Sequence, residues 1–283
     1  MRVVITRPSS EARHWADSVR AAGHEPVLIP LIGIEPLADG ANLQKAWRQL
    51  GENAAAMFVS GNAVHFFMLA RPLTEAGQAA EPIRTRAWAT GPGTRQALLA
   101  CGWPGHLIDT PHAAAIQFDS EALWAVVKLQ LAPGHKVLVV RGETVAMPSH
   151  RESRQPCGTV GTVLGQALDQ APGTGRDWLA QKITEAGALP VFCISYLRRV
   201  PDLSTEHMRQ IRGAVGTGVV WLFSSSEALN NLTALVPGEN WARACAVATH
   251  PRIAQSAQAA GFGTVRVTRP TVVDVLASIE SLA

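Results

Sequence analysis

The sequence of 283 residues is poor in the residues that build metal sites and disulfide frameworks. Its four cysteines (Cys101, Cys157, Cys193 and Cys245) are scattered with no close pair. This spacing excludes a cysteine-based zinc site of the usual kind and argues against a disulfide framework. The nine histidines are scattered too and form no H-E-x-x-H pattern. We therefore expect a protein without a metal.

The motifs of several enzyme classes are also missing. The sequence has no G-x-S-x-G elbow, no P-loop and no G-x-G-x-x-G after its first predicted strand. Charged residues make up only 17% of the chain, and 25 basic against 22 acidic residues give a formal net charge of +3. Without a run of Lys and Arg, so small an excess does not indicate a nucleic-acid partner. It suits an anionic small molecule if the charge is gathered locally.

Long apolar runs are absent as well. No run approaches the length of a membrane span, and residues 1–7 are too few for the core of a signal peptide. We expect a cytoplasmic protein with no membrane partner. A hydrophobic content of 47% indicates a substantial core, and the length favours two domains of ordinary size.

One stretch that is present, residues 219–229, has a pattern of its own. An apolar run stops at Ser224, Ser225 and Ser226 and then continues with helical spacing, which is typical of a buried parallel strand that leads into a helix. Ser225 or Ser226 can cap this helix, or the same N–H groups can hold an anion. Residues 55–64 repeat the pattern around Ser60.

The rest of the chain alternates between strand and helix patterns, which predicts parallel α/β sheets. Two extended segments, 30–36 and 195–201, interrupt this alternation. We predict a first domain from residues 1–31 plus 202–283, an inserted domain from 38–194, and linker strands 32–37 and 195–201 that pair as a ladder. Residues 144–175 are rich in Pro, Gly and Ser, which indicates a flexible insertion with at most a short helix at 162–168. Each sheet should be flavodoxin-like, with a cleft between the domains and ligands at the carboxyl ends of the strands.

An internal repeat supports this division. Phe58-Val59-Ser60 matches Leu222-Phe223-Ser224, Thr90-Gly91-Pro92 matches Thr249-His250-Pro251, and Asp109-Thr110-Pro111 matches Thr268-Arg269-Pro270. Similar sheets can arise independently. The matched order of turn residues favours a duplication instead.

Residues that follow the predicted strands are the candidates for binding an anion. Arg7 and Arg141 can each hold a carboxylate, or can be ordinary surface arginines. Ser60, Gly61, Asn62 and the three serines from Ser224 to Ser226 are helix caps or anion donors, and their recurrence favours the second role. Gly93 and Thr94 form a turn that brings the backbone close to a ligand, or a plain tight turn. Thr249 and His250 also end a strand, although a single histidine is more often structural.

Tyr196, the only tyrosine in the chain, lies in the second extended segment. Its phenol can donate a proton while staying uncharged at neutral pH. Packing of its ring against the linker is the alternative role.

Taken in order, these motifs resemble the uroporphyrinogen-III synthase family. The resemblance rests on Val4-Ile5-Thr6-Arg7-Pro8, Pro30-Leu31-Ile32-Gly33-Ile34-Glu35-Pro36, Phe58-Val59-Ser60-Gly61-Asn62-Ala63-Val64, Thr90-Gly91-Pro92-Gly93-Thr94, Val139-Val140-Arg141-Gly142-Glu143, Tyr196-Leu197-Arg198-Arg199, Phe223-Ser224-Ser225-Ser226 and Thr249-His250-Pro251-Arg252-Ile253-Ala254. Each motif is weak by itself, but their order and spacing cover nearly the whole chain outside 144–175.

The resemblance implies two α/β domains with the active site between them, and a lyase that needs no cofactor. In the family, hydroxymethylbilane loses water and closes to uroporphyrinogen III with its last pyrrole ring inverted, through a spiro-pyrrolenine. By match, Tyr196 corresponds to the tyrosine proposed to assist departure of the hydroxyl, and Ser60, Thr94 and Ser224 line the cleft. The partner implied is one polyanionic linear tetrapyrrole, and we expect a monomer.

Two departures from the family pattern stand out. Asn62 occupies a position that is usually basic, and His250-Pro251-Arg252 replaces a Gly-x-Thr type of turn. The competing hypothesis is a non-catalytic two-domain protein that closes on an anionic small molecule. It accounts equally well for the crossing segments and the strand-end donors, but not for the motif set.

Overall fold

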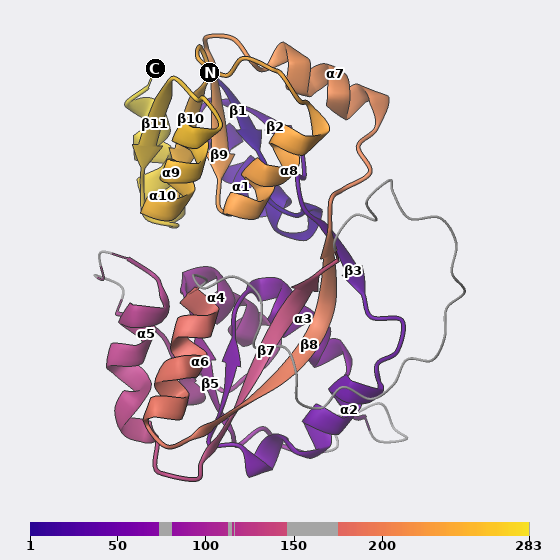
Figure 1. The fold of residues 1–283 in the computed structure, drawn as a ribbon, viewed down its shortest axis with the longest axis vertical. Helices are drawn as coiled ribbons and strands as arrows, with labels where there is room; N and C mark the ends of the chain where they lie inside the picture. The colour runs from indigo at the N-terminus through magenta and orange to yellow at the C-terminus, as the bar shows by residue number, and fades with distance from the viewer. Residues whose placement is uncertain (74–80, 113–114, 116, 146–174, 283) are drawn as a thin grey trace.

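The structure is a computed structural model that describes residues 1–283 apart from 74–80, 113–114, 116, 146–174 and 283. The described chain forms two mainly parallel sheets, each flanked by helices, with both chain ends in the same half of the molecule (Figure 1). The predicted short helix at 162–168, and most of the predicted insertion 144–175, lie outside the described residues.

The first sheet combines strands from the beginning and the end of the chain. Its order is β11-β10-β9-β1-β2, and all four pairings are parallel. The strands are β1 (Arg2–Ile5), β2 (Glu25–Leu28), β9 (Val219–Phe223), β10 (Cys245–Ala248) and β11 (Thr264–Val267). The helices of this half are α1 (Ser9–Ala21), α7 (Thr205–Gly213), α8 (Ser226–Leu235), α9 (Pro251–Ala259) and α10 (Val272–Glu280).

The second sheet has the order β3-β8-β7-β4-β5-β6, in which only the β3–β8 pair is antiparallel. Its strands are β3 (Gly33–Pro36), β4 (Ala55–Phe58), β5 (Arg86–Ala89), β6 (Ile108–Asp109), β7 (Lys136–Thr144) and β8 (Leu189–Arg199). The helices are α2 (Ala41–Arg48), α3 (Gly61–Leu69), α4 (Pro92–Ala100), α5 (Ser120–Val127) and α6 (Gly175–Glu185), with short 3-10 turns at Leu50–Glu52, Gly105–Leu107 and Lys128–Gln130.

The two sheets have the same spatial arrangement of strands, but the chain forms the strands in a different order. Numbered along the chain, the five strands of the first sheet run 2-1-3-4-5, which is the flavodoxin order. Without β3, the second sheet runs 5-4-1-2-3, which is the same arrangement entered at its third strand. This confirms the expected pair of flavodoxin-like sheets. It also places β4, β5 and β6 in the positions of β9, β10 and β11, as the sequence repeat predicts.

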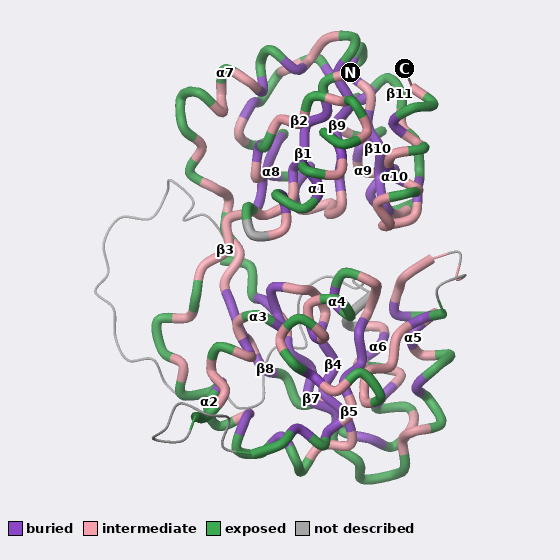
Figure 2. The backbone as a smooth tube through the Cα atoms, turned by 180° about the vertical axis from the view of Figure 1, so that it is seen from behind, coloured by how far each residue is buried: buried purple, intermediate pink, exposed green. Residues whose placement is uncertain are grey.

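The central strands of both sheets are apolar and buried, as Figure 2 shows by the purple colour of β1, β4, β7 and β9. Each half has a core of aromatic residues on one face of its sheet. In the first half Trp221 lies 5.3 Å from Trp241 between ring centroids, and in the second Phe58 lies 5.4 Å from Trp103. Truncating a buried aromatic residue to Ala costs about 3–5 kcal/mol, so these clusters stabilise each sheet separately.

Strands β7 and β8 are longer than the sequence predicts. We expected strands at 136–140 and 189–194 followed by a separate linker strand at 195–201. Instead β8 continues as one strand to Arg199, because β7 extends to Thr144 and supplies pairing partners along its length. The pairing shifts register between Arg141 and Gly142, which marks a bulge.

The outer edge of this lengthened strand pairs with β3. Gly33–Pro36 runs antiparallel to the last part of β8, so that Pro36 faces Tyr196. Ile34 packs against the cores of both halves. The proposed domain boundaries 1–31 plus 202–283, 38–194, 32–37 and 195–201 remain predictions.

Helix α1 has no side-chain cap at its start, since Pro8 occupies the cap position and Ser9 is the first helical residue. Gly23 ends that helix with φ of +79°, a left-handed conformation that favours glycine. Within the described parts of the chain, no helix is long and apolar enough to cross a membrane.

Candidate active site

Tyr196 and Ser60 form the centre of the site. Tyr196 is 3% exposed, and its hydroxyl lies 3.1 Å from the Oγ of Ser60. Ser60 lies two residues after the end of β4 and caps α3, since its Oγ accepts a hydrogen bond from the Ala63 N–H at 3.1 Å. The ring of Phe66, also from α3, stacks on the Tyr196 ring with centroids 5.7 Å apart. The structure therefore joins two predicted site residues that are 136 positions apart in the sequence.

A second group connects the first half of the molecule to the start of α3. The Nη1 of Arg7 lies 3.1 Å from Glu11 Oε2, and its guanidinium stacks over the Trp15 ring at 4.5 Å. The other oxygen of Glu11 accepts a hydrogen bond from Asn62 Nδ2 at 2.9 Å. Burial lowers the pKa of Arg7, and the charge and hydrogen bond of Glu11 oppose this shift. Arg7 thus already holds a carboxylate, one that belongs to its own chain.

Glu227 makes a corresponding bridge at the start of α8. Its Oε2 lies 3.0 Å from Arg198 Nη1, and its Oε1 accepts from Thr144 Oγ1 at 3.3 Å. Arg198 and Thr144 belong to β8 and β7 of the second sheet, whereas α8 flanks the first. Glu11 and Glu227 therefore each tie the two halves together beside a helix N-terminus.

The serines after β9 differ from one another in role. Ser225 caps α8, with its Oγ accepting from the Glu227 N–H at 3.2 Å, and Ser226 is the first helical residue. Ser224 lies before the cap and is half-buried, and its hydroxyl makes no hydrogen bond within the described residues. Ser225 is therefore committed to the cap, and the half-buried hydroxyls of Ser224 and Ser226 are the ones available to a ligand.

Thr249 and His250 occupy the start of α9. Thr249 is 6% exposed, and its backbone N–H donates to the Phe223 carbonyl oxygen at 3.1 Å. His250 caps α9 through Nδ1, which accepts from the Arg252 N–H at 3.1 Å. Burial and the positive charge of Arg252 lower the pKa of His250, while Asp119 and Glu121 raise it. Both of these acidic residues come from the second half of the molecule, so His250 faces it.

The remaining candidates lie on α3, α4 and β7. Gly91 caps α4 and Pro92 begins it, so Gly93 and Thr94 lie in its first turn, with Gly93 exposed and Thr94 6% exposed. Arg141 stacks over the Phe192 ring at 4.8 Å. Gly61 lies against Ala97 of α4, where an added Cβ would be 3.7 Å from the Cβ of Ala97.

Three arginines around these contacts retain an unused donor. The Nε atoms of Arg7, Arg141 and Arg198 are buried and have no hydrogen-bond partner among the described residues. Buried polar groups are normally paired, so each unpaired N–H needs an explanation. A carboxylate of a bound substrate is a suitable partner, because arginine binds carboxylates through several N–H groups at once.

Several residues of the site were not predicted from the sequence. Glu11 had a local signal, since it lies four positions after Arg7 on one face of α1. Gly142 and Arg198 occur within longer sequence motifs but were not predicted as site residues, and neither were Phe66 and Glu227. Tertiary contacts bring all four to the site.

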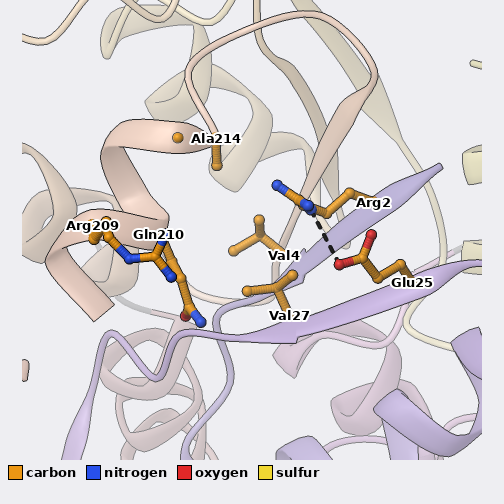
Figure 3. A pocket seen from close by; sticks show the side chains of 8 residues that line it. Arg2, Val4, Glu25, Val27, Arg209, Gln210 and Ala214 are labelled. Carbon is orange, nitrogen blue, oxygen red and sulfur yellow. Dashed lines mark ion pairs between the residues drawn. The ribbon is translucent and has the colours of Figure 1, made fainter. Parts of the chain in front are cut away.

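A surface hollow of roughly 250 Å³ lies elsewhere (Figure 3). It is lined by Arg2, Glu25, Arg209 and Gln210 among others, and Arg2 and Glu25 form an ion pair across it at 3.4 Å. Arg2 and Glu25 are the first residues of β1 and β2, whereas ligands of parallel sheets bind at the carboxyl ends of strands. We therefore do not assign the substrate to this hollow.

The site has neither a metal cluster nor an activated thiol among the residues that the structure describes. No group of three or more His, Cys, Asp or Glu side chains there is placed to hold a metal ion. Cys193 is buried beside the site, and burial raises the pKa of its thiol to about 11. A thiol with so high a pKa is a poor nucleophile at neutral pH.

Comparison with known proteins points to one family. Residues 13–147 match the family model described as uroporphyrinogen-III synthase HemD. The match spans just under half of the chain, and over that part the chain is similar to the uroporphyrinogen-III synthase family. The similarity implies an enzyme, a cyclising lyase in the general sense. No curated protein sequence matches the chain significantly.

Two solved structures of uroporphyrinogen III synthases share the fold. A mutant of the enzyme from Thermus thermophilus is 16% identical, with a TM-score of 0.51, and the match covers 100% of this chain and 98% of that one. The enzyme from Helicobacter pylori is 15% identical, with a TM-score of 0.52, and the match covers 100% of both chains. At these identities the likeness establishes the two-part α/β fold of the family.

Proposed function

We propose that this chain converts hydroxymethylbilane to uroporphyrinogen III by loss of water and inversion of the last pyrrole ring. The match of residues 13–147 to the family model supports the reaction. The substrate class is supported by the three arginines whose buried Nε atoms have no partner among the described residues, because the substrate carries acetate and propionate groups around its length. We further propose, as the sequence predicts, that it acts as a cytoplasmic monomer.

Binding of the carboxylates is assigned to both halves of the molecule. Helix N-termini attract anions through free N–H groups and the positive end of the helix dipole. The helices α3, α4, α8 and α9 each begin directly after a parallel strand. Ser224, Thr249 and the backbone around Gly93 supply further donors, and Arg7 can exchange Glu11 for a substrate carboxylate. A flexible tetrapyrrole held along both walls is thereby folded into a shape close to a ring.

The chemistry proposed for the site requires one proton donor. Tyr196 gives its phenol proton to the departing hydroxyl group of the substrate, which leaves as water. The resulting cation is attacked by the substituted carbon of the terminal ring, and a spiro-pyrrolenine then rearranges to the product. Positioning supplies much of the rate, because holding reacting atoms together replaces an entropic barrier worth up to about 7–11 kcal/mol.

The test supplies freshly generated hydroxymethylbilane to the purified protein and separates the product isomers. We expect uroporphyrinogen III in excess over the isomer I that forms spontaneously. Isomer I alone would refute the assignment. Tight binding of the linear tetrapyrrole without turnover would show that the chain is instead a binding protein.

A further inference from the structure

The Tyr196 ring lies on a residue that has no side chain. Gly142 is the direct neighbour of Tyr196 in the β7–β8 pairing and follows the register shift at Arg141. A Cβ at Gly142 would lie 2.8 Å from Cε1 of the ring and even closer to Cζ, and real Cβ atoms essentially never make such contacts. The bulge thus presents bare backbone where the ring rests, and any other residue at position 142 displaces the phenol.

The hydroxyl of Ser60 is partly committed before it meets Tyr196. As the cap of α3, its oxygen uses one lone pair to accept a hydrogen bond from the Ala63 N–H. A serine hydroxyl has one proton and two lone pairs, so Ser60 can still donate its proton to the Tyr196 oxygen at 3.1 Å. In that arrangement the phenol keeps its own proton for a third group. The N–H at the start of α3 strengthens Ser60 as a donor, since consecutive hydrogen bonds polarise one another.

Phe66 completes the contacts of the ring. It lies in the second turn of α3, the same helix that Ser60 caps, and its ring is inclined by 22° to that of Tyr196. The helix therefore fixes both the face of the ring, through Phe66, and its oxygen, through Ser60. Movement of α3 moves both contacts together.

We propose that Gly142, Phe66 and Ser60 are positioning residues for Tyr196, and that Ser60 acts through the phenol rather than on the substrate. This assignment rests on the proposed function. It changes the role of Ser60, which the sequence predicted as a substrate-binding donor. Once Tyr196 has given up its proton, the Ser60 hydroxyl and the N-terminus of α3 stabilise the phenolate. The phenol proton leaves in the water formed from the substrate's hydroxyl group. The cationic intermediate loses one proton as it becomes the product, and this proton restores the phenol, so the reaction needs no oxidant or reductant.

The first experiment uses the fact that the chain has a single tyrosine. Protein grown with tyrosine labelled with carbon-13 at Cζ gives one NMR signal, and this signal comes from Tyr196. Gly142→Ala should shift and broaden the signal, whereas Gly51→Ala should leave it unchanged because an added Cβ at Gly51 meets no atom within 4 Å. This readout does not depend on activity. An unshifted signal in folded Gly142→Ala would show that Gly142 does not position the Tyr196 ring.

The kinetic arm measures kcat and KM of the same variants. Gly142→Ala should lower kcat by about 10- to 100-fold with KM within about twofold, because a displacement of about 1 Å can cost that much rate. Phe66→Leu, a milder change, should lower kcat by a smaller factor and covers the case that Gly142→Ala does not fold. A rise in KM without a fall in kcat in both variants would contradict a positioning role.

The decisive arm is a double-mutant cycle of Ser60 with Tyr196. Ser60→Gly removes the hydroxyl while costing the helix cap only a few tenths of a kcal/mol, and Ser60→Thr restores the hydroxyl. We expect Ser60→Gly to lower kcat several-fold in the natural chain, Ser60→Thr to recover it, and neither to matter in a Tyr196→Phe background. An effect that persists in that background would show that Ser60 contacts the substrate. If neither the natural protein nor any variant catalyses the synthase reaction, while Gly142→Ala still shifts the NMR signal, the proposed function is refuted. The positioning of Tyr196 by Gly142 is then still supported.

Discussion

The two sheets use the same device, a buried strand that leads through serine into a helix, and put it to different uses. After β4, Ser60 both caps α3 and contacts Tyr196. After β9 these tasks are separated, because Ser225 caps α8 while Ser224 keeps a hydroxyl without a partner among the described residues. One half therefore uses its serine to contact Tyr196, the proposed proton donor, and the other keeps the Ser224 hydroxyl for the proposed ligand.

The different roles of the serines follow from the lengths of the neighbouring strands in each sheet. In the second sheet β7 and β8 extend past the level of β4 and bring Tyr196 over α3. The corresponding strands of the first sheet, β1 and β2, end at Ile5 and Leu28. Two similar sheets thus become one asymmetric active site by lengthening a single pair of strands.

The largest effect should come from the phenol itself. Tyr196→Phe removes the proposed proton donor and should lower kcat by about 100-fold, which is the scale of general acid catalysis. Steady-state rates of isomer III formation measure this change. Complete loss of activity in a folded variant would contradict the view that positioning supplies much of the rate.

The bridge at Glu11 should affect stability next most strongly. Glu11→Gln leaves the buried guanidinium of Arg7 without its ion pair, and we expect the free energy of unfolding to fall by about 1–2 kcal/mol. Denaturant unfolding measures the change, with Glu206→Gln as the control. The Glu206–Arg209 pair lies on the exposed surface of α7, so its loss should cost less than about 0.5 kcal/mol. Equal effects of the two substitutions would rule out a special role for the Glu11 bridge.

The serines after β9 allow the comparison to be sharpened further. Ser224→Ala should raise KM about two- to tenfold, the value of one hydrogen bond, without changing stability. Ser225→Ala should instead lower stability by about 1 kcal/mol through loss of the α8 cap. Kinetics and unfolding of both variants test the assignment, which fails if the two substitutions exchange effects.

The smallest expected effect is a pH dependence at His250. Burial and Arg252 lower the pKa of His250 in the folded chain, whereas an unfolded histidine titrates near its ordinary value of about 6.5. As pH falls below about 6.5 the unfolded chain takes up the proton first, so the free energy of unfolding declines. His250→Asn, which keeps a cap acceptor for α9, should reduce this decline between about pH 7.5 and pH 5.5. Identical pH profiles for both chains would show that His250 does not contribute.

The sequence predicted most of the architecture because its signals are local. The apolar runs at 55–59 and 219–223 are buried parallel strands, and the Pro after Gly91 or His250 begins a helix in both halves. The repeat also predicted the matching order of strands. The repeat aligned Ser60 with Ser224, however, whereas in the structure the residues that cap the corresponding helices are Ser60 and Ser225.

The contacts that create the site could not be predicted in this way. Ser60 and Tyr196 are 136 positions apart, and Glu11 and Asn62 are 51 apart, so neither pair has a local pattern. Gly142 belongs to one of the sequence motifs, but only the pairing of β7 with β8 places it under the ring. The register shift that brings it there depends on hydrogen bonds between strands that are distant in sequence.

The unbroken course of β8 has a mechanical consequence. This strand belongs to the second sheet and also pairs with β3, where the chain crosses between the halves, so the crossing is the natural pivot for a rotation of one half against the other. Atoms move in such a rotation in proportion to their lever arm. Tyr196 lies on the pivot and moves least, while the helix tips far from it sweep the widest arc. The molecule can thus adjust its grip on a large, flexible ligand while the group assigned to the chemistry stays nearly still.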